Sequence, residues 1–203
     1  MLDLGCGPGS LPARLIERLP QAEIVAVDVD PLLLALARAR HPDAARYVQA
    51  VIGEEGWTST LGLEGSVDAV VSTTALHYLP EGVLRSTYAE LTALLRPGGV
   101  LINADHLSQD GAGFAEIAEF VGVRRAERRH AFEHEDWEAW WSAVENEPEL
   151  MDLCAERRKP SAEHTDCAVT LGRHVELLTE AGFGHASPVW QVGNSYVLVA
   201  IRQ

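Results

Sequence analysis

The sequence is poor in cysteine, in basic residues and in long apolar runs. Its three cysteines are odd in number and form no C-x-x-C pair, so we expect reduced thiols and a cytoplasmic protein. Only 16 Lys and Arg stand against 30 Asp and Glu, and the net charge of −14 argues against general binding to nucleic acid or anionic membranes. No apolar run approaches the ~18 residues of a membrane span.

Other signals are also missing. The eight histidines show neither H-E-x-x-H nor Cys/His ligand spacing, so no metal site is expected. There are no internal repeats and no low-complexity segments, and Met1 opens an apolar stretch rather than a basic signal-peptide region. A length of 203 residues therefore predicts one domain, residues 1–203, with room for a real core.

What the sequence does have is a glycine-rich loop at its start. A short apolar strand within residues 1–4 runs into Gly5, Gly7 and Gly9, and apolar residues at helical spacing follow directly. A strand, a glycine turn and a helix together present backbone N–H groups and a helix N-terminus to a ligand. A tight turn without any ligand is the alternative explanation of the glycines alone.

The spacing of these glycines disfavours a dinucleotide site. The fingerprint G-x-G-x-x-G would need glycine at position 10, where this chain has Ser10, and its third glycine, Gly9, comes one residue early. Asp3, two residues before the first glycine, is also foreign to a purely apolar dinucleotide-binding strand. The glycine loop therefore disfavours an NAD-binding oxidoreductase.

A second acidic residue follows the next predicted strand. The apolar run 24–27 suits a buried parallel strand, and Asp28 ends it, 23 positions after Gly5. A carboxylate there can accept hydrogen bonds from both hydroxyls of a ribose. Its other possible role is to cap the next helix, but Asp30 with Pro31 already serves that purpose.

Strands and helices alternate along the rest of the first half. Further strands are predicted at 47–52, 67–72 and 100–105, with helices at 32–40 and 83–95 between them, and Arg96-Pro97-Gly98-Gly99 ends the second helix. This rhythm indicates βαβ units and a parallel sheet. A last helix at 174–183 precedes two strands, 189–192 and 196–201, joined by the hairpin signal Gly193-Asn194.

With these motifs on the page, the sequence resembles the class I S-adenosylmethionine-dependent methyltransferases that act on small molecules. The resemblance is carried by the glycine loop 3–9, by Val27-Asp28, by Ala75-Leu76-His77 and by the segment 95–99. It implies an α/β three-layer Rossmann-like sandwich, with a mostly parallel seven-stranded sheet of order 3-2-1-4-5-7-6 and strand 7 antiparallel. It also implies S-adenosylmethionine as cofactor, bound by Asp3, Gly5, Cys6, Gly7, Gly9, Asp28, Val29, Val51, Ile52, Ser72 and His77.

The chain departs from this family pattern in two places. Val51 stands where relatives usually carry an acidic residue that contacts the adenine amino group, and Glu54 or a backbone carbonyl is the expected substitute. Relatives also have a helix before the first strand, whereas Met1 already lies inside it. We therefore expect either a misplaced start or a fragment, with weaker cofactor binding and an exposed apolar patch that favours a homodimer.

The catalytic residue is harder to read than the cofactor loop. Methyl transfer from a sulfonium needs mainly proximity and orientation, and a general base only if the acceptor loses a proton. Candidate bases are His106 and His77, which follow the fifth and fourth predicted strands, together with His130 and His134. His106 is the preferred base, and cofactor positioning is the preferred role of His77.

The residues between strand five and the last helix form a helical insertion, 106–165, that we expect to act as a substrate lid. Apolar residues at helical spacing predict three amphipathic helices there. Trp137, Trp141 and Arg128 are predicted to contact a small-molecule acceptor, whose accepting atom (O, N or C) is open. Simple packing of the tryptophans and a solvated face for the arginines are the alternatives. A non-catalytic protein that senses S-adenosylmethionine is the alternative to an enzyme.

Overall fold

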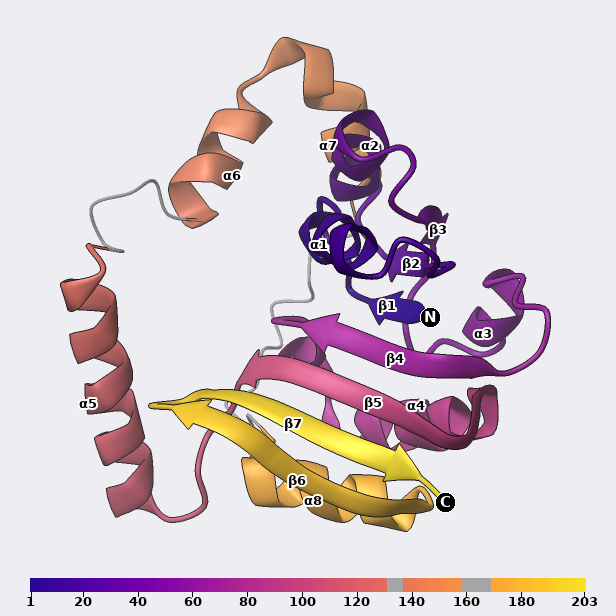
Figure 1. Cartoon of the computed structure of the whole chain (residues 1–203). Coiled ribbons are helices and arrows are strands. Elements are labelled where there is room, and N and C mark those ends of the chain that lie inside the picture. Colours follow the sequence, from indigo (N-terminus) through magenta and orange to yellow (C-terminus); the bar gives the residue numbers. More distant parts are fainter. Residues whose placement is uncertain (131–136, 158–168) are drawn as a thin grey trace.

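A computed structural model describes residues 1–130, 137–157 and 169–203 and shows an α/β fold around one sheet (Figure 1). Its strands follow the order β3-β2-β1-β4-β5-β7-β6. The strands are β1 (Leu2–Leu4), β2 (Val25–Asp28), β3 (Arg46–Gln49), β4 (Val67–Thr73), β5 (Leu95–His106), β6 (Phe183–Val192) and β7 (Ser195–Arg202). The order is the one the sequence implied.

The short strand β1 lies in the middle of this sheet. It pairs in parallel with β2 on one side and with β4 on the other, and all three of its residues are buried. Strand β7 pairs antiparallel with both β5 and β6, which confirms the expected antiparallel strand. Because the parallel strands end at one edge, the loops after β1, β2, β4 and β5 meet there, where open α/β sheets bind ligands.

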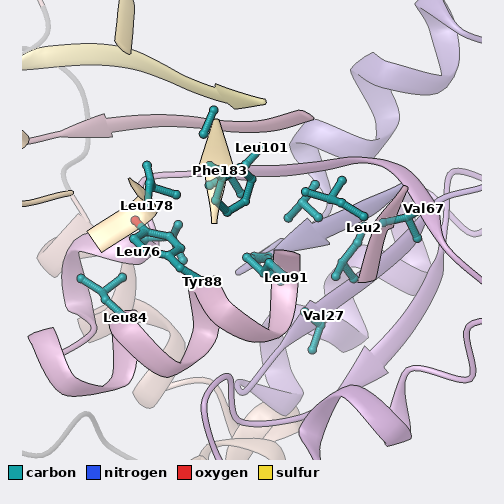
Figure 2. Packing of buried hydrophobic residues seen from close by; sticks show 14 of the residues in the cluster. Leu2, Val27, Val67, Leu76, Leu84, Tyr88, Leu91, Leu101, Leu178 and Phe183 are labelled. Atoms are coloured by element: carbon teal, nitrogen blue, oxygen red, sulfur yellow. The ribbon is translucent and has the colours of Figure 1, made fainter. Parts of the chain in front are cut away.

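Helices cover both faces of the sheet. Side chains alternate along β1 and β2. Leu2 and Val27 therefore join the main core with residues of α4 and α8 (Figure 2). Ala26 packs with Leu34 of α2 on the other face. The described helices are α1 (Ser10–Arg18), α2 (Pro31–Arg40), α3 (Trp57–Thr60), the 3-10 turn η1 (Leu76–Tyr78), α4 (Glu81–Leu94), α5 (Ala112–Arg128), α6 (Trp137–Glu145), η3 (Pro148–Leu150), α7 (Met151–Glu156) and α8 (Leu171–Glu180). None of the helices in these ranges is long and apolar enough to cross a membrane.

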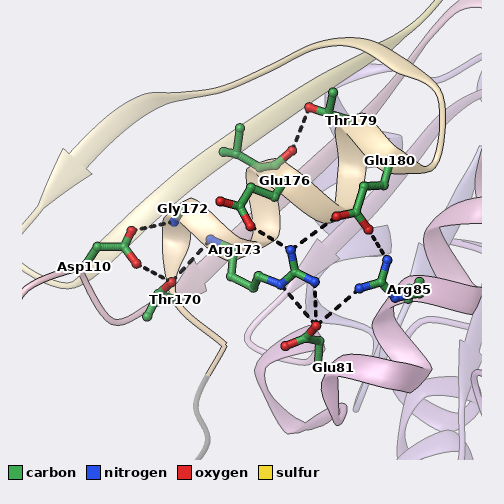
Figure 3. A network of polar contacts seen from close by, with 10 residues as sticks. Glu81, Arg85, Asp110, Thr170, Gly172, Arg173, Glu176, Thr179 and Glu180 are labelled. Atoms are coloured by element: carbon green, nitrogen blue, oxygen red, sulfur yellow. Dashed lines mark hydrogen bonds and ion pairs between the residues drawn. The ribbon is translucent and has the colours of Figure 1, made fainter.

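Polar contacts join α8 to α4 and to Asp110, just before α5 (Figure 3). Arg173 of α8 pairs with Glu81 of α4 at 2.6 Å, and Arg85 of α4 pairs with Glu180 of α8. The Asp110 carboxylate accepts hydrogen bonds from Thr170 Oγ1 at 2.6 Å and from the Gly172 N–H at 3.0 Å. These contacts are exposed and individually weak, so they set the position of α8 more than its stability.

The insertion does not lie as one unit over the sheet edge. Helices α6 and α7 pack on α2, where Trp140 and Trp141 join Leu32 and Leu33 in a separate apolar cluster. Arg157, just after α7, pairs with Asp30 at 2.6 Å and lies 3.3 Å from the centre of the Trp141 ring. Helix α5 stands instead beside the tip of the β6–β7 hairpin (Figure 1). His134 and two stretches of the predicted insertion lie outside the described residues.

Several predicted boundaries are wrong. Strand β5 runs from Leu95 to His106, because the glycine-rich segment 96–99 continues past an irregularity into pairing with β4. Strand β6 begins at Phe183 rather than 189, since pairing with β7 extends it. β6 is an edge strand, where Pro188 is tolerated. Helix α8 accordingly begins and ends three residues earlier than predicted.

Candidate functional site

The glycine loop is held to strand β2 by its own backbone. The N–H groups of Gly5 and Cys6 both donate to the Val27 carbonyl, at 2.9 and 3.0 Å. The Gly7 N–H donates to Asp28 Oδ2 at 2.7 Å. Gly5, Gly7 and Gly9 all have positive φ, which side chains rarely adopt, so the sequence had to place glycine at each of them.

The three glycines serve different neighbours. A Cβ on Gly5 would lie 2.3 Å from Ala75 Cβ, and one on Gly9 would lie 2.9 Å from the Tyr47 hydroxyl, so both glycines allow close packing inside the chain. A Cβ on Gly7 would meet nothing within 4 Å. Gly7 is therefore the loop glycine with open space at its Cβ position, although its N–H is already bonded to Asp28. Close approach of a ligand is the role that the sequence suggested for all three.

Asp3 lies beneath this loop in an unusual state. It is fully buried, and neither carboxylate oxygen has a hydrogen-bond partner among the described residues. Burial, and secondarily the nearby charge of Asp28, raises the pKa of Asp3 to about 7. A buried carboxyl without a partner is costly, and such groups cluster at functional sites.

Asp28 clamps the loop, and Asp30 caps the helix as predicted. Asp28 accepts from Gly7 through Oδ2 and from the Asp30 N–H through Oδ1, at 2.9 Å. Asp30 Oδ1 accepts from the N–H groups of Leu32 and Leu33, with Pro31 at the first helical position. Desolvation raises the pKa of Asp28, although its backbone hydrogen bonds oppose that shift. The ribose role stays a prediction, compatible with the second lone pair on each oxygen.

A cavity of about 330 Å³ opens beyond the ends of β2 and β3. Val29 and Val51 line it, as does Glu54, the predicted substitute for the missing acidic residue. Its remaining lining residues are Gln49, Ala50, Glu55, Trp57, Thr60 and Glu156. This cavity follows the strand that ends in Asp28, where the nucleoside part of a cofactor would lie in an open α/β sheet.

Three other predicted cofactor contacts have structural partners. Ser72 is buried and donates from Oγ to the Leu4 carbonyl at 2.9 Å, which joins β4 to β1. Ile52 packs against the main core, and Cys6 packs with Ala26 on the α2 face, where desolvation raises the pKa of its thiol. Their contact with a cofactor stays a prediction.

His77 and Asp105 form a close pair where β4 and β5 end. His77 Nδ1 lies 2.5 Å from Asp105 Oδ1, and the backbone N–H of His77 donates to Asp105 Oδ2 at 3.2 Å. The Asp105 side chain is fully buried, whereas that of His77 is 27% exposed. Thr74, in the loop that leads to His77, has φ +48, a strained conformation for a β-branched residue. The same loop places Ala75 against Gly5, so the pair borders the glycine loop.

His106, the preferred base in the sequence analysis, has a different environment. It is exposed at the end of β5, and its Nδ1 lies 3.2 Å from Ser195 Oγ. A second cavity of about 360 Å³ lies there. It is lined by His106, Gly122, Arg125, Ala126, Arg129, Trp190, Asn194 and Ser195. His106 therefore faces an open pocket but lacks the buried carboxylate partner that orients His77.

The predicted acceptor residues are dispersed. Trp141 packs between α2 and Arg157, which matches the packing alternative, while Trp137 is 54% exposed and stacks on Trp140 with ring centres 5.2 Å apart. Arg128 is exposed and is not among the residues lining the second cavity, where Arg125 and Arg129 lie instead. Sequence spacing cannot separate neighbouring arginines on one helix, because only the packing of α5 decides which of them face the hairpin.

The family comparison agrees with this geometry. Residues 1–99 match the model of a family described as methyltransferase domain, a segment that contains the glycine loop, Asp28 and His77. The first half of the chain is thus similar to a methyltransferase domain. The match ends within β5, so Asp105, the second cavity and the insertion lie beyond it.

Curated relatives are similar over the same share of the chain. A trans-aconitate 2-methyltransferase of Methylobacterium radiotolerans is 37% identical over 100 residues, which are 49% of this chain and 35% of that protein. One from Deinococcus radiodurans is 38% identical over 113 residues, or 53% of this chain and 40% of that protein. The chain thus spans less than half the length of the curated relatives it matches.

Solved structures share the fold over the entire chain. An O-methyltransferase family protein from Burkholderia thailandensis has a TM-score of 0.63 at 16% identity, covering 100% of this chain and 50% of that one. A TehB-like S-adenosylmethionine-dependent methyltransferase from Corynebacterium glutamicum has a TM-score of 0.56 at 16% identity, covering 100% and 79%. The chain therefore has the Rossmann-like methyltransferase fold, including β6 and β7.

Proposed function

We propose that this protein transfers a methyl group from S-adenosylmethionine to a small-molecule acceptor. Two neighbouring observations carry the proposal. Gly7 has open space at its Cβ position, and the buried Asp3 carboxyl has no hydrogen-bond partner among the described residues. A ligand that carries positive charge and approaches the loop backbone would satisfy both. The family match of residues 1–99 and the shared fold support this assignment.

The residues present fit the cofactor. Asp3 would face the charged methionine part, Asp28 the ribose hydroxyls, and the cavity lined by Val29 and Val51 the adenine. Glu54 lies in that cavity and can serve where relatives use an acidic residue after the third strand. When bound, the cofactor supplies an electrophilic methyl group on a positively charged sulfur.

His77 is the general base that the geometry supports best. The Asp105 carboxylate, 2.5 Å away, can accept a hydrogen bond from Nδ1–H, which favours the tautomer with the lone pair on Nε2. That nitrogen can take a proton from an O–H or N–H acceptor as the acceptor attacks. General base catalysis of this kind contributes about 10²–10⁴-fold to a rate. In this assignment His77, rather than His106, holds and moves the proton.

The acceptor is proposed from the relatives' names. Because two relatives at 37% and 38% identity are trans-aconitate 2-methyltransferases, a small carboxylic acid is the first acceptor class to test. Accepting carboxylates need no general base, whereas acceptors that must lose a proton as they attack, such as hydroxyl groups, do. The effect of removing His77 would therefore also report which kind of atom accepts the methyl group.

Binding and turnover test the proposal separately. Calorimetry should show binding of S-adenosylhomocysteine and none of NAD; NAD binding alone would overturn the assignment. Turnover of methyl-labelled cofactor, first with trans-aconitate and then with a pool of metabolites, distinguishes an enzyme from a protein that only senses the cofactor. Binding without transfer to any fraction of the pool would favour the sensor.

A further inference from the structure

The second cavity is built by a close approach of two backbones. A Cβ on Gly193, in the turn between β6 and β7, would lie 2.6 Å from the backbone nitrogen of Gly122 in α5. A Cβ on Gly122 would in turn lie 2.9 Å from Asn194 Oδ1. Glycine at both positions lets α5 seat directly on the hairpin tip. The hairpin is further fixed by the Leu107 N–H, which donates to the Asn194 carbonyl at 2.9 Å.

The charge inside this cavity is opposite to that of the protein. Arg125 and Arg129 line it one helical turn apart, and no Asp or Glu is among the described residues that line it. Within the described ranges neither arginine forms an ion pair, whereas Arg124 on the same helix pairs with Glu127 at 2.8 Å. Arg125 instead lies over the Trp190 ring, 5.2 Å from its centre. A chain with a net charge of −14 repels anions, so two guanidinium groups in one pocket without a carboxylate partner among the described residues need an explanation.

The cavity also borders the proposed catalytic pair. His106 lines it, and the backbone N–H of His106 donates to Asp105 Oδ1, the same oxygen that contacts His77, at 2.8 Å. Asn194 and Ser195 add polar groups that can donate hydrogen bonds, and the Trp190 ring adds an apolar surface. The residues that line this cavity all lie beyond the matched segment 1–99, so the family match does not assign them.

We propose that this cavity is the anion-binding half of the acceptor site, where Arg125 and Arg129 hold the carboxylates of an acidic small molecule beside His106. That the bound acid is the methyl acceptor rests on the proposed methyltransferase function, whereas the binding of the acid does not. Guanidinium groups bind carboxylates through paired N–H donors, and such charge-assisted hydrogen bonds are the strong ones. The acid's carbon skeleton would then lie against Trp190.

Binding of a matched pair of probes tests this directly. The probes are tricarballylate and its neutral triamide, titrated by ligand-observed NMR without cofactor. Tricarballylate should bind, the triamide should bind at least tenfold more weakly, and affinity should fall with added salt. Arg125→Gln and Arg129→Gln should each weaken tricarballylate binding at least fivefold. Arg129→Lys should lose less affinity than Arg129→Gln, because lysine keeps the charge but not the paired N–H donors.

Arg124→Gln is the matched control, since Arg124 lies on the same helix but does not line the cavity. The affinity of this variant for tricarballylate should stay within twofold of that of the parent protein. Equal binding of acid and amide, no binding of either, or an equal loss in Arg124→Gln would overturn the assignment. Calorimetry with S-adenosylhomocysteine on the same variants keeps the two proposals apart. If S-adenosylhomocysteine does not bind, the methyltransferase function is refuted. If it binds normally and the Arg125 and Arg129 variants bind tricarballylate as the parent does, only the anion site is refuted.

Discussion

Asp105 Oδ1 lies 2.5 Å from His77 Nδ1, although the two residues are 28 positions apart in the chain. The contact exists because β4 and β5 are parallel neighbours, in which Thr73, the last residue of β4, is paired with Ala104, next to Asp105. The turn η1 then brings His77 back over the end of β5. A buried carboxylate thereby orients an accessible imidazole at the edge of the sheet where the glycine loop also lies.

The first prediction concerns this pair. With an acceptor that must lose a proton, His77→Gln should lower kcat by about 10²–10⁴-fold, and Asp105→Asn should lower it substantially because the preferred tautomer is lost. The dissociation constant of S-adenosylhomocysteine should change little. His185→Gln, an exposed histidine on β6, is the control. If His106→Gln abolishes turnover while His77→Gln does not, His106 is the base.

The second prediction follows from the pKa of Asp3, which burial raises to about 7. A positively charged cofactor favours the ionised carboxylate, so its affinity should fall about tenfold per pH unit below pH 7, with proton release on binding. Calorimetry in buffers of different ionisation enthalpy measures that proton. Asp3→Asn should bind more weakly and without this pH dependence; a variant that still releases the proton would show that another group titrates.

The raised pKa of Asp3 also predicts that the Asp3→Asn substitution stabilises the protein. The folded-state pKa of Asp3 lies above its unfolded value of 3.8, so ionisation inside the fold destabilises the protein increasingly as pH rises from about 4 to about 7. Asp3→Asn should therefore unfold at a higher urea concentration than the parent, by a margin that grows over this range and is constant above it. An equal margin at pH 4.5 and pH 8 would contradict the assignment.

The third prediction concerns His174, which is fully buried with its Nδ1 2.7 Å from the Tyr88 hydroxyl. Burial lowers the pKa of His174 from 6.5 to about 4. The unfolded chain therefore binds a proton that the folded chain does not, and stability should fall as pH drops from 6.5 to 4, by up to about 3 kcal/mol. In His174→Gln, the amide oxygen can still accept a hydrogen bond from Tyr88. The free energy of unfolding in urea should therefore fall less between pH 6.5 and pH 4 in this variant than in the parent protein.

The fourth prediction separates two glycines of the loop. Gly5→Ala places a Cβ 2.3 Å from Ala75 Cβ at a φ of +68, so it should destabilise the fold by about 3 kcal/mol or more. Gly7→Ala meets no neighbour and should cost only about 1–2 kcal/mol of backbone strain. Its main effect should be weaker binding of S-adenosylhomocysteine. Equal losses of stability in both variants, with cofactor binding intact in Gly7→Ala, would remove Gly7 from the site.

The sequence by itself determined the sheet and the half of the site that is local in the chain. A βα turn and a helix start depend on neighbouring residues, so the sequence alone predicts them. This holds for the glycines 5, 7 and 9, for the apolar run that ends in Asp28, and for the Asp30-Pro31 cap. The hairpin of β6 and β7 was equally readable from Gly193-Asn194, although its length was set by pairing that spacing does not show.

Only the tertiary structure decided which side chains complete the site. Asp105 reads as one polar residue at the end of a strand, and its partnership with His77 depends on strand order and on the turn η1. The same is true of the arginines of α5, where the sequence favoured Arg128 and the packing of Gly122 on Gly193 turned Arg125 and Arg129 toward the hairpin. Contacts between residues far apart in sequence arise from packing whole elements, and no local periodicity specifies which face of a helix meets which turn.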